Sequence, residues 1–577
     1  MRTDGKVVDR LCGAANLWRQ AGFLPALLAF LSKPQSGISS QVGQALSPVK
    51  RLFQHPPGHA LLLLLAPVLC AQQFDVLVAN GKIVDGAGGP WYYADVAIKG
   101  DTIAAIGHFD PKTAARTIDA RGMVVAPGFI DIHTHARRGI FIDPSAQNYI
   151  RQGVTTLMEG NDGSSPIPIA PFLADIAKAH PAPNFGIFAG QGSIRSAVMQ
   201  LVNRPATPEE IEKMRVLMRQ AMLDGAFGMS TGLFYVPGNF TPPDEVIEVA
   251  KVAGAMGGMH ISHMRNESAQ ILASVKETIR IGEEGHMPTQ VTHHKIIGGA
   301  NWGLSKGTLE LIEEARSRGV DVSIDAYPYT ASSTGSAALI PQWAQEGGQK
   351  ALVERLNAPS QRARIKTVVI DNIKYDRGAG DPANVVMASC GFDKNLAGKS
   401  LADVTRDRGR AVNFENAAET LLEIQTAGGC SVVYHAISEE DVERILKYPF
   451  TMIGSDGEIP QFGVGAPHPR SYGTFARVLG RYVRERHTLT LEDAVHRMSG
   501  LPATRLKLYD RGLLRPGMKA DVVVFDPVTV ADKAEFERPH QYAVGFKDVV
   551  INGKPVIAAG ELTKERPGKV LYGPAKQ

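Results

Sequence analysis

The chain has 577 residues, which is too long for one small hydrophobic core and indicates two or three domains. Charged residues make up 21% and hydrophobic residues 44%, which is ordinary for a globular protein. The formal net charge is only +4, and the sequence has no basic stripe with interleaved aromatic residues, so nucleic acid is not indicated as a partner. None of the four cysteines forms a C-x-x-C pair, which implies neither a zinc knuckle nor a disulfide framework.

The first 73 residues differ in character from the rest. Val49-Lys50-Arg51 is basic, and residues 60–71 form an apolar run of twelve residues that ends in a small residue. This order is typical of a secretory signal peptide cleaved after Ala71, and the run is too short to span a bilayer. We therefore predict a signal peptide at residues 49–71 and leave residues 1–48 unassigned, with a true start near Val49. The expected location is periplasmic or secreted if this signal is used, and cytoplasmic otherwise.

Short β-strands are expected near both ends of the remaining chain. The first of them alternates apolar and polar residues around an Asn80-Gly81 turn. The same pattern returns close to the carboxyl terminus, so we predict one small β-sandwich domain built from residues 74–125 and 505–577. Its strands are expected at residues 74–85, 94–99, 102–106, 521–526 and 548–551.

The middle of the chain alternates apolar strands with amphipathic helices. Helix starts are marked by Thr207 and Ser438, each of which precedes an acidic residue by three positions. This alternation predicts an α/β fold, a parallel (β/α)8 TIM barrel over residues 126–504. The interval at about 335–427 is too long for a structureless loop and predicts an inserted lid subdomain before the eighth strand. The eight strands are expected at residues 124–135, 153–159, 185–190, 225–230, 257–263, 289–294, 320–326 and 450–455.

Side chains that bind metals lie at several of these strand ends. His133 and His135 are one residue apart, so they share a face if the strand is extended there. Active groups of such a barrel project from the carboxyl ends of its strands, so the side chains at different strand ends should converge. Imidazole and carboxylate ligands fit zinc, and manganese or iron are compatible as well. The other candidates are Glu159 and Asp162 after the second strand, His263 after the fifth, His293 and His294 after the sixth, and Asp456 after the eighth.

Longer motifs resemble the amidohydrolase superfamily and, within it, the N-acyl-D-amino-acid deacylases (D-aminoacylases), over roughly residues 74–577. They are PGFIDIHTH at 127–135, GAFGMSTGLFYVPG at 225–238, SHMRNE at 262–267, HHK at 293–295, DAYPYTASST at 325–334, IGSDG at 453–457 and HPRSYGTF at 468–475. The resemblance implies metal-dependent hydrolysis of the amide bond of N-acyl-D-amino acids, which yields a carboxylate and a free D-amino acid. It also implies one or two divalent ions, with zinc preferred.

The resemblance assigns the metal ligands to specific positions. At the sixth strand we choose His293, because His294 should face the opposite side. The family carries a cysteine ligand in G-N-C-G, where this chain has Asp162, and Glu159 is the alternative replacement. Gln191 stands where a histidine is expected. The implied ligands are His133, His135, Asp162, His263, His293 and Asp456.

Catalysis and substrate binding follow from the same resemblance. Asp456 is expected to take a proton from the metal-activated water and to deliver it to the leaving amine. The substrate keeps a free carboxylate, so an anion-binding group is expected as well. Arg470 is a candidate because guanidinium binds carboxylate in a fork. The residues implied by resemblance are Lys295, Tyr235, Tyr327 and Ser333.

Three alternatives remain open. Cyclic-amide hydrolases such as hydantoinases and dihydroorotases carry a carboxylated lysine on the fourth strand, but residues 225–233 contain no lysine. A dipeptidase of the same superfamily is the second alternative. A non-catalytic relative is the third, although the retained histidine pair and Asp456 count against it. The expected partner is a small N-acyl amino acid, and no transmembrane segment is expected in the mature chain.

Overall fold

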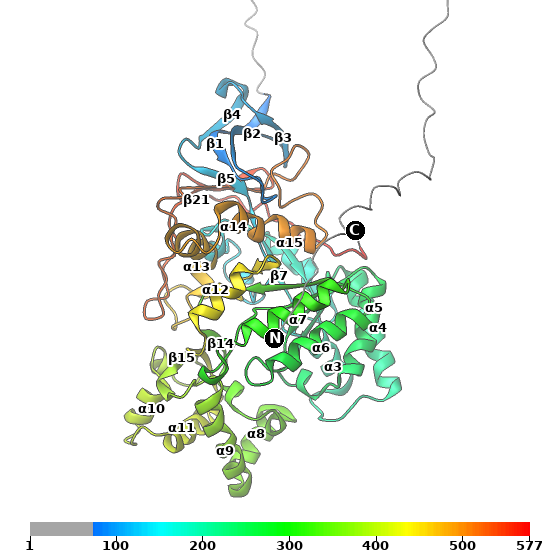
Figure 1. The fold of residues 1–577 in the computed structure, drawn as a ribbon, viewed down its shortest axis with the longest axis vertical. Coiled ribbons are helices and arrows are strands. Elements are labelled where there is room, and N and C mark those ends of the chain that lie inside the picture. Colours follow the sequence, from blue (N-terminus) through cyan, green and yellow to red (C-terminus); the bar gives the residue numbers. More distant parts are fainter. Residues whose placement is uncertain (1–72, 577) are drawn as a thin grey trace, which may run out of the picture. The chain divides into compact units, whose positions relative to one another are not determined.

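The structure, a computed structural model, describes residues 73–576 (Figure 1). The signal peptide expected at residues 49–71 and the unassigned residues 1–48 lie outside the described residues. Within residues 73–576, every helix is either too short or too polar to cross a membrane. The fold is of the α/β type, with several sheets and many helices.

Both ends of the described chain contribute to one nine-stranded sheet, with the order β21-β20-β19-β18-β5-β1-β2-β3 and β4 beside β1. The two ends meet where β5 pairs with β18 in antiparallel register. Alternate residues of β1 enter different apolar clusters, because successive side chains of a strand point to opposite faces. The bounds are β1 Phe74–Ile83, β2 Tyr92–Lys99, β3 Thr102–Gly107, β4 Ala114–Asp119, β5 Val124–Pro127, β18 Val522–Phe525, β19 Phe546–Ile551, β20 Lys554–Ala558 and β21 Glu561–Leu562.

The middle of the chain forms two parallel sheets, β6-β7-β8 and β17-β13-β12-β11-β10-β9. At one edge they are joined by a parallel bridge between Thr134 and Gly457. At the other edge, the Phe227 amide donates to the Ile187 carbonyl at 2.9 Å. The bounds are β6 Phe129–Asp131, β7 Val154–Glu159, β8 Asn184–Ile187, β9 Ala189–Gly190, β10 Gly228–Gly232, β11 Met259–His263, β12 Thr289–Val291, β13 Val322–Ala326 and β17 Thr451–Ile453.

The strand expected at residues 124–135 is in fact two strands, so this prediction was wrong. β5 belongs to the nine-stranded sheet and β6 to a parallel sheet, and Gly128 separates them. A Cβ at Gly128 would lie 2.2 Å from the Thr155 hydroxyl oxygen, so the close approach at this junction requires glycine. The consequence is that His133 and His135 follow the end of β6 and do not lie within an extended strand.

Helices follow most of the parallel strands and cover them with apolar faces. At α4, Thr207 and Glu210 form a reciprocal capping box, and at α12 the Ser438 hydroxyl accepts from the Asp441 amide. The bounds are α1 Gln147–Ile150, α2 Ile169–Ala179, α3 Gln191–Met199, α4 Pro208–Asp224, α5 Pro243–Ala255, α6 Ile271–Glu284, α7 Ser305–Ser317, α12 Glu439–Lys447, α13 Arg470–Arg477, α14 Leu491–Met498 and α15 Gly500–Arg505.

The chain between β13 and β17 has a core of its own, which includes Leu352, Val369 and Leu421. It holds a three-stranded antiparallel sheet, β14-β16-β15, and four helices that Figure 1 shows grouped with it. The bounds are β14 Ser332–Gly335, β15 Val385–Cys390, β16 Cys430–Tyr434, α8 Gly348–Asn357, α9 Pro359–Tyr375, α10 Leu401–Asp407 and α11 Phe414–Thr426.

A disulfide bond joins Cys390 and Cys430 at neighbouring ends of β15 and β16. The cysteine spacing had implied no disulfide framework. The sequence could not reveal this bond because the partners are 40 residues apart and come together only through the register of two strands.

Candidate metal centre

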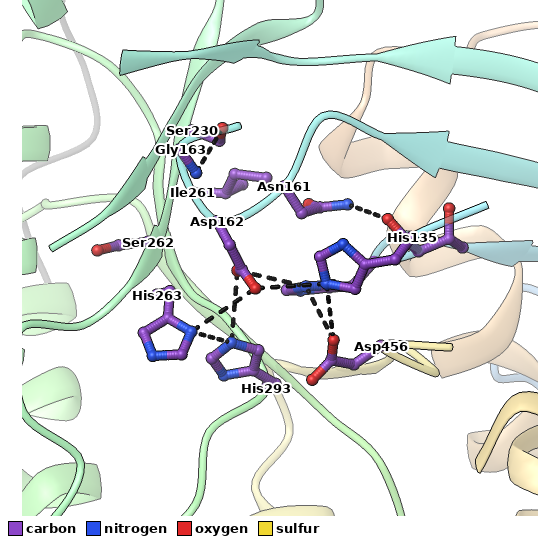
Figure 2. A network of polar contacts seen from close by, with 12 residues as sticks. His135, Asn161, Asp162, Gly163, Ser230, Ile261, Ser262, His263, His293 and Asp456 are labelled. Carbon is purple, nitrogen blue, oxygen red and sulfur yellow. Dashed lines mark hydrogen bonds and ion pairs between the residues drawn. The ribbon is translucent and has the colours of Figure 1, made fainter. Parts of the chain in front are cut away.

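The structure brings the six side chains of the expected ligand set together. Their donor atoms form two overlapping groups, and within each group all of them lie within 4.8 Å of one another. Asp162 belongs to both groups. Figure 2 shows its carboxylate pointing between His135 on one side and His263 and His293 on the other. The first group is His133, His135, Asp162 and Asp456, and the second is Asp162, His263 and His293.

Each oxygen of the Asp162 carboxylate faces imidazoles from both histidine pairs. Oδ1 lies 3.4 Å from the Nε2 atoms of both His133 and His293. Oδ2 lies 3.4 Å from His135 Nε2 and 3.6 Å from His263 Nδ1. The carboxylate therefore lies between the two histidine pairs, within reach of cation positions beside either pair.

Asp456 completes the first group. Its Oδ1 lies 2.9 Å from His135 Nε2 and 3.6 Å from His133 Nε2. Its Oδ2 accepts a hydrogen bond of 2.7 Å from Arg470 Nη1. One oxygen of this carboxylate therefore faces the imidazoles, while a guanidinium orients the other.

Three of these residues have a left-handed backbone. φ is +54° at Asp162, +35° at His293 and +52° at Asp456. This conformation is costly for residues with a Cβ and is concentrated at functional sites, where the surrounding structure holds it. Backbone hydrogen bonds hold it here: the Asp456 amide donates to the His133 carbonyl at 2.8 Å, and the His293 amide donates to Asp325 Oδ1 at 2.8 Å.

The site has the properties expected of a cation site. His133 Nδ1 and Nε2, His263 Nε2 and Asp162 Oδ1 are buried and have no hydrogen-bond partner among the described residues. Buried polar atoms are normally satisfied, so several orphans in one cluster indicate a missing partner. Nitrogen and oxygen donors of this kind suit zinc and other divalent ions.

The charges in the cluster support the same interpretation. Burial favours the neutral imidazole of His133, but the charges of Asp162 and Asp456 outweigh it and raise the pKa to about 10. A bound cation would take the place of that proton, because metal ligation requires neutral histidine.

A further carboxylate, Glu267, supports the imidazoles of the second group. Its Oε2 lies 3.6 Å from His263 Nε2, and its Oε1 lies 3.2 Å from His293 Nδ1. Both rings thus present one nitrogen to Asp162 and the other to Glu267, as is typical of ligand histidines held by an outer carboxylate. The sequence signal was present, because Glu267 ends the SHMRNE motif, but it was not used.

Asp325, at the end of β13, has a similar role for the first group. Its Oδ1 lies 3.6 Å from His133 Nδ1 and accepts the His293 amide. The side chain is fully buried. Sequence reasoning assigned no function to Asp325 because it reaches the histidine of a different strand.

Glu267 is itself held by two cations. Lys295 Nζ lies 2.5 Å from Oε1, and Arg377 Nη2 lies 3.3 Å from Oε2. Arg377 comes from the segment between β13 and β17 and lies over the Phe234 ring at 4.4 Å from its centroid. It was missed because it is 110 residues from Glu267 in the chain and belongs to no motif that was recognised.

The residues expected to bind the substrate carboxylate lie beside the cluster but differ in availability. The three donors of Lys295 Nζ are directed to Glu267, to His293 Nδ1 and to the His293 carbonyl.

Arg470 Nη2 donates to the Ser333 carbonyl at 3.3 Å, and the Tyr327 ring lies 4.9 Å from the Arg470 guanidinium. The Tyr327 hydroxyl is buried and unpartnered among the described residues. The Tyr235 hydroxyl meets the Thr334 hydroxyl at 3.0 Å.

Three other side chains considered from the sequence are absent from the two donor groups. Glu159 accepts a hydrogen bond of 2.9 Å from the Arg137 amide and belongs to neither donor group. His294 meets the Thr308 hydroxyl at 2.8 Å, on the side of α7. Gln191 is buried, and both polar atoms of its side chain lack a partner among the described residues.

The chain belongs to the Amidohydrolase family, which it matches over residues 116–557. It is 39% identical over 526 residues to a D-aminoacylase of Alcaligenes xylosoxydans xylosoxydans, covering 87% of this chain and 98% of that protein.

Two solved structures are similar as well. An N-acyl-D-glutamate deacylase of Bordetella bronchiseptica, complexed with zinc and a phosphonate mimic of the tetrahedral intermediate, is 34% identical and has a TM-score of 0.74. It matches 87% of this chain and 100% of its own. A D-aminoacylase described with a binuclear metal centre is 36% identical and has a TM-score of 0.73, covering 86% of this chain and 100% of its own.

Proposed function

We propose that the protein is a divalent-metal-dependent hydrolase that converts N-acyl-D-amino acids to a carboxylate and a free D-amino acid. The observation that carries this proposal is the position of Asp162, whose carboxylate lies between two pairs of imidazoles. The similarity to D-aminoacylase over most of the chain supports the substrate class.

The proposed ligands are the six residues of the two donor groups, with Asp162 in place of the family cysteine. A carboxylate is a harder ligand than a thiolate, which widens the range of divalent ions that can bind. We propose one or two ions, with zinc preferred, since zinc is named in the related deacylase structure. Glu159 is not proposed as a ligand because it belongs to neither donor group.

A bound divalent ion would polarise the scissile carbonyl and lower the pKa of a water molecule toward neutrality. Asp456 is positioned to accept a proton from that water and to pass it to the leaving amine. Its Oδ2 is fixed by Arg470, which leaves Oδ1 facing the imidazoles. Despite burial, the charges of Arg470 and protonated His133 hold the pKa of Asp456 well below its usual range. A cation in place of the His133 proton would keep a positive charge beside Asp456, and Arg470 would still favour its ionised form.

The substrate carboxylate is proposed to lie near Arg470, Ser333 and Tyr327. Arg470 keeps donors beyond the two that contact Asp456 and the Ser333 carbonyl, and the Tyr327 hydroxyl is unpartnered among residues 73–576. Lys295 and Tyr235 line the cavity near these residues, where Lys295 contributes positive charge and Tyr235 contributes an aromatic surface. Lys295 would have to give up a present contact to bind an anion directly.

The domain arrangement is proposed as follows. β8 and β9 are parts of one strand interrupted at Phe188, so the two parallel sheets contain eight strands in the order β6-β7-β8/β9-β10-β11-β12-β13-β17. The contacts at both edges support a closed (β/α)8 barrel over residues 126–504, with a lid at about 335–427. Residues 74–125 and 505–577 would form the β-sandwich domain.

Export is proposed for the mature chain. The signal-like pattern at residues 49–71 and the Cys390–Cys430 disulfide both support an oxidising compartment, periplasmic or extracellular.

The test is a hydrolysis panel of N-acetyl-D-amino acids, N-acetyl-L-amino acids, hydantoins and dipeptides, with zinc supplied. We expect turnover of D-configured N-acetyl compounds and none of hydantoins. Turnover restricted to L-compounds, to hydantoins or to dipeptides would overturn the proposal.

A further inference from the structure

The cation cluster opens into a cavity of about 890 Å³. Cavities of this size lie toward the upper end of those that bind drug-sized ligands, and an N-acetyl amino acid is much smaller than such a ligand. The cavity therefore has space that an acetylated substrate leaves unfilled.

The two sides of the cavity have different chemistry. The loops after β12, β13 and β17 contribute Lys295, Ser333, Asp456 and Arg470 to its lining. The segments after β7, β9 and β10 line the rest of the cavity. Tyr235, after β10, meets Thr334 at 3.0 Å and so belongs to the wall that carries Ser333. We call the remainder of these segments the α3 lobe. It is lined by Ile167, Ser193, Ser196, Leu201, Val236 and Pro237.

The proposed reaction assigns each part of the substrate to one side. The leaving amine must lie near Asp456, which delivers its proton, and the substrate carboxylate must lie near Arg470. Both groups belong to the amino-acid portion. The acyl portion extends from the other side of the scissile carbonyl, so we assign it to the α3 lobe, the part of the cavity that the amino-acid portion leaves unfilled.

The α3 lobe lacks the charges that a charged acyl group would need. Among the described residues that line the cavity from its three loops, Asp162 is the only one with a carboxylate, and none is a lysine or an arginine. The Asp162 carboxylate already faces the imidazoles of the cation cluster. A peptide substrate would bring a free ammonium into this half-buried lobe, where it would lose part of its hydration without gaining an ion pair.

We propose that the α3 lobe is an acyl-binding subsite that selects neutral acyl groups longer than acetyl. This inference rests on the proposed function. Small side chains on α3 leave room for the chain, and Ile167, Leu201 and Val236 supply apolar contacts. Removing apolar surface from water stabilises the complex with each additional methylene.

The experiment measures kcat/KM of the zinc-loaded enzyme for N-acetyl, N-propanoyl, N-butanoyl and N-hexanoyl derivatives of one D-amino acid. Each added methylene is expected to raise kcat/KM by about twofold to fourfold, the range set by partial to full burial of a methylene. If the acetyl compound is hydrolysed but kcat/KM stays constant or falls as the acyl chain grows, the proposed subsite is overturned. Inactivity toward every acyl compound, acetyl included, overturns the proposed function instead.

A matched pair of substrates tests whether the α3 lobe selects a neutral acyl group over a charged one. The glycyl and propanoyl derivatives differ only in an ammonium in place of a methyl group. We expect the propanoyl compound to be hydrolysed at least tenfold more efficiently. Equal or better hydrolysis of the glycyl compound would instead identify the lobe as a peptide subsite and overturn the proposal.

A variant localises the effect. Ser196 is half-buried on α3, lines the cavity and has no side-chain hydrogen bond among the described residues. Ser196→Phe should abolish the gain from longer chains, because the aromatic ring fills the subsite. Ser317→Phe, on the exposed end of α7, is the control and should keep the wild-type series. An unchanged dependence of kcat/KM on acyl length in a folded Ser196→Phe protein contradicts the placement of the subsite on α3. If that variant does not fold, the dependence measured with the wild-type enzyme decides whether the subsite exists.

Discussion

Glu267 is the residue through which the imidazoles, Lys295 and Arg377 are connected, and its replacement by glutamine has two separate consequences. The side chain is only 2% exposed and pairs with Lys295 at 2.5 Å and with Arg377 at 3.3 Å. Glu267→Gln keeps the shape but removes the counter-charge that contacts both Lys295 and Arg377. Breaking buried pairs of this kind costs about 3–5 kcal/mol in the free energy of unfolding.

The second consequence concerns metal binding. Glu267 faces the outer nitrogens of His263 and His293, so the variant loses the carboxylate that orients both rings. Loss of such an outer partner lowers metal affinity by about 10-fold to 100-fold. Affinity is measured by competition with a chromophoric chelator. Stability is measured by urea unfolding without metal, because bound metal would itself stabilise the folded state.

Glu277→Gln is the matched control. Glu277 pairs with Arg265 at 2.8 Å, but the pair is partly exposed and lies outside the cation cluster. We expect at most about 1 kcal/mol of lost stability and unchanged metal affinity. If Glu267→Gln binds metal as tightly as wild type, Glu267 does not orient the imidazoles, whatever happens to stability.

Three further predictions concern the cluster and the disulfide. Asp456→Asn should bind zinc and substrate but lose nearly all turnover, and a rate near wild type in steady-state assays would remove Asp456 from the proton-transfer role. Asp162→Ala removes a donor from both groups, so metal content by mass spectrometry should fall below one ion per chain, and undiminished loading would exclude the shared-carboxylate geometry. Replacing Cys390 and Cys430 by serine opens a loop of 40 residues. It should lower the free energy of unfolding of this segment by about 4 kcal/mol, and an unchanged urea midpoint would refute a stabilising role.

Much of the cluster could be predicted because its residues lie in local patterns at strand ends. His133, His135, His263 and Asp456 each end an apolar segment, and convergence follows from a parallel arrangement. The local geometry was less predictable. His133 and His135 were expected on an extended strand, yet β6 ends at Asp131 and the rings converge from a loop. The left-handed backbone at Asp456 depends on a hydrogen bond to the His133 carbonyl, which lies beyond the end of β6 and far away in the sequence.

The rest of the site depends on tertiary contacts. Arg377 reaches Glu267 from a segment that folds around its own core, and no spacing rule connects the two. The strand break at Gly128 results from the close approach of Thr155, which is not evident from either residue alone. Sequence reasoning therefore selected the side chains that the structure brings together in the two donor groups, and missed those that hold them in place.

The central claim is that the histidines and Asp162 together hold a divalent cation. The most direct measurement is anomalous diffraction from crystals of the zinc-loaded protein. We expect a zinc peak within about 2.0–2.2 Å of an Asp162 oxygen and of imidazole nitrogens from the two donor groups. Full-occupancy zinc elsewhere, with no peak beside Asp162, would contradict the account.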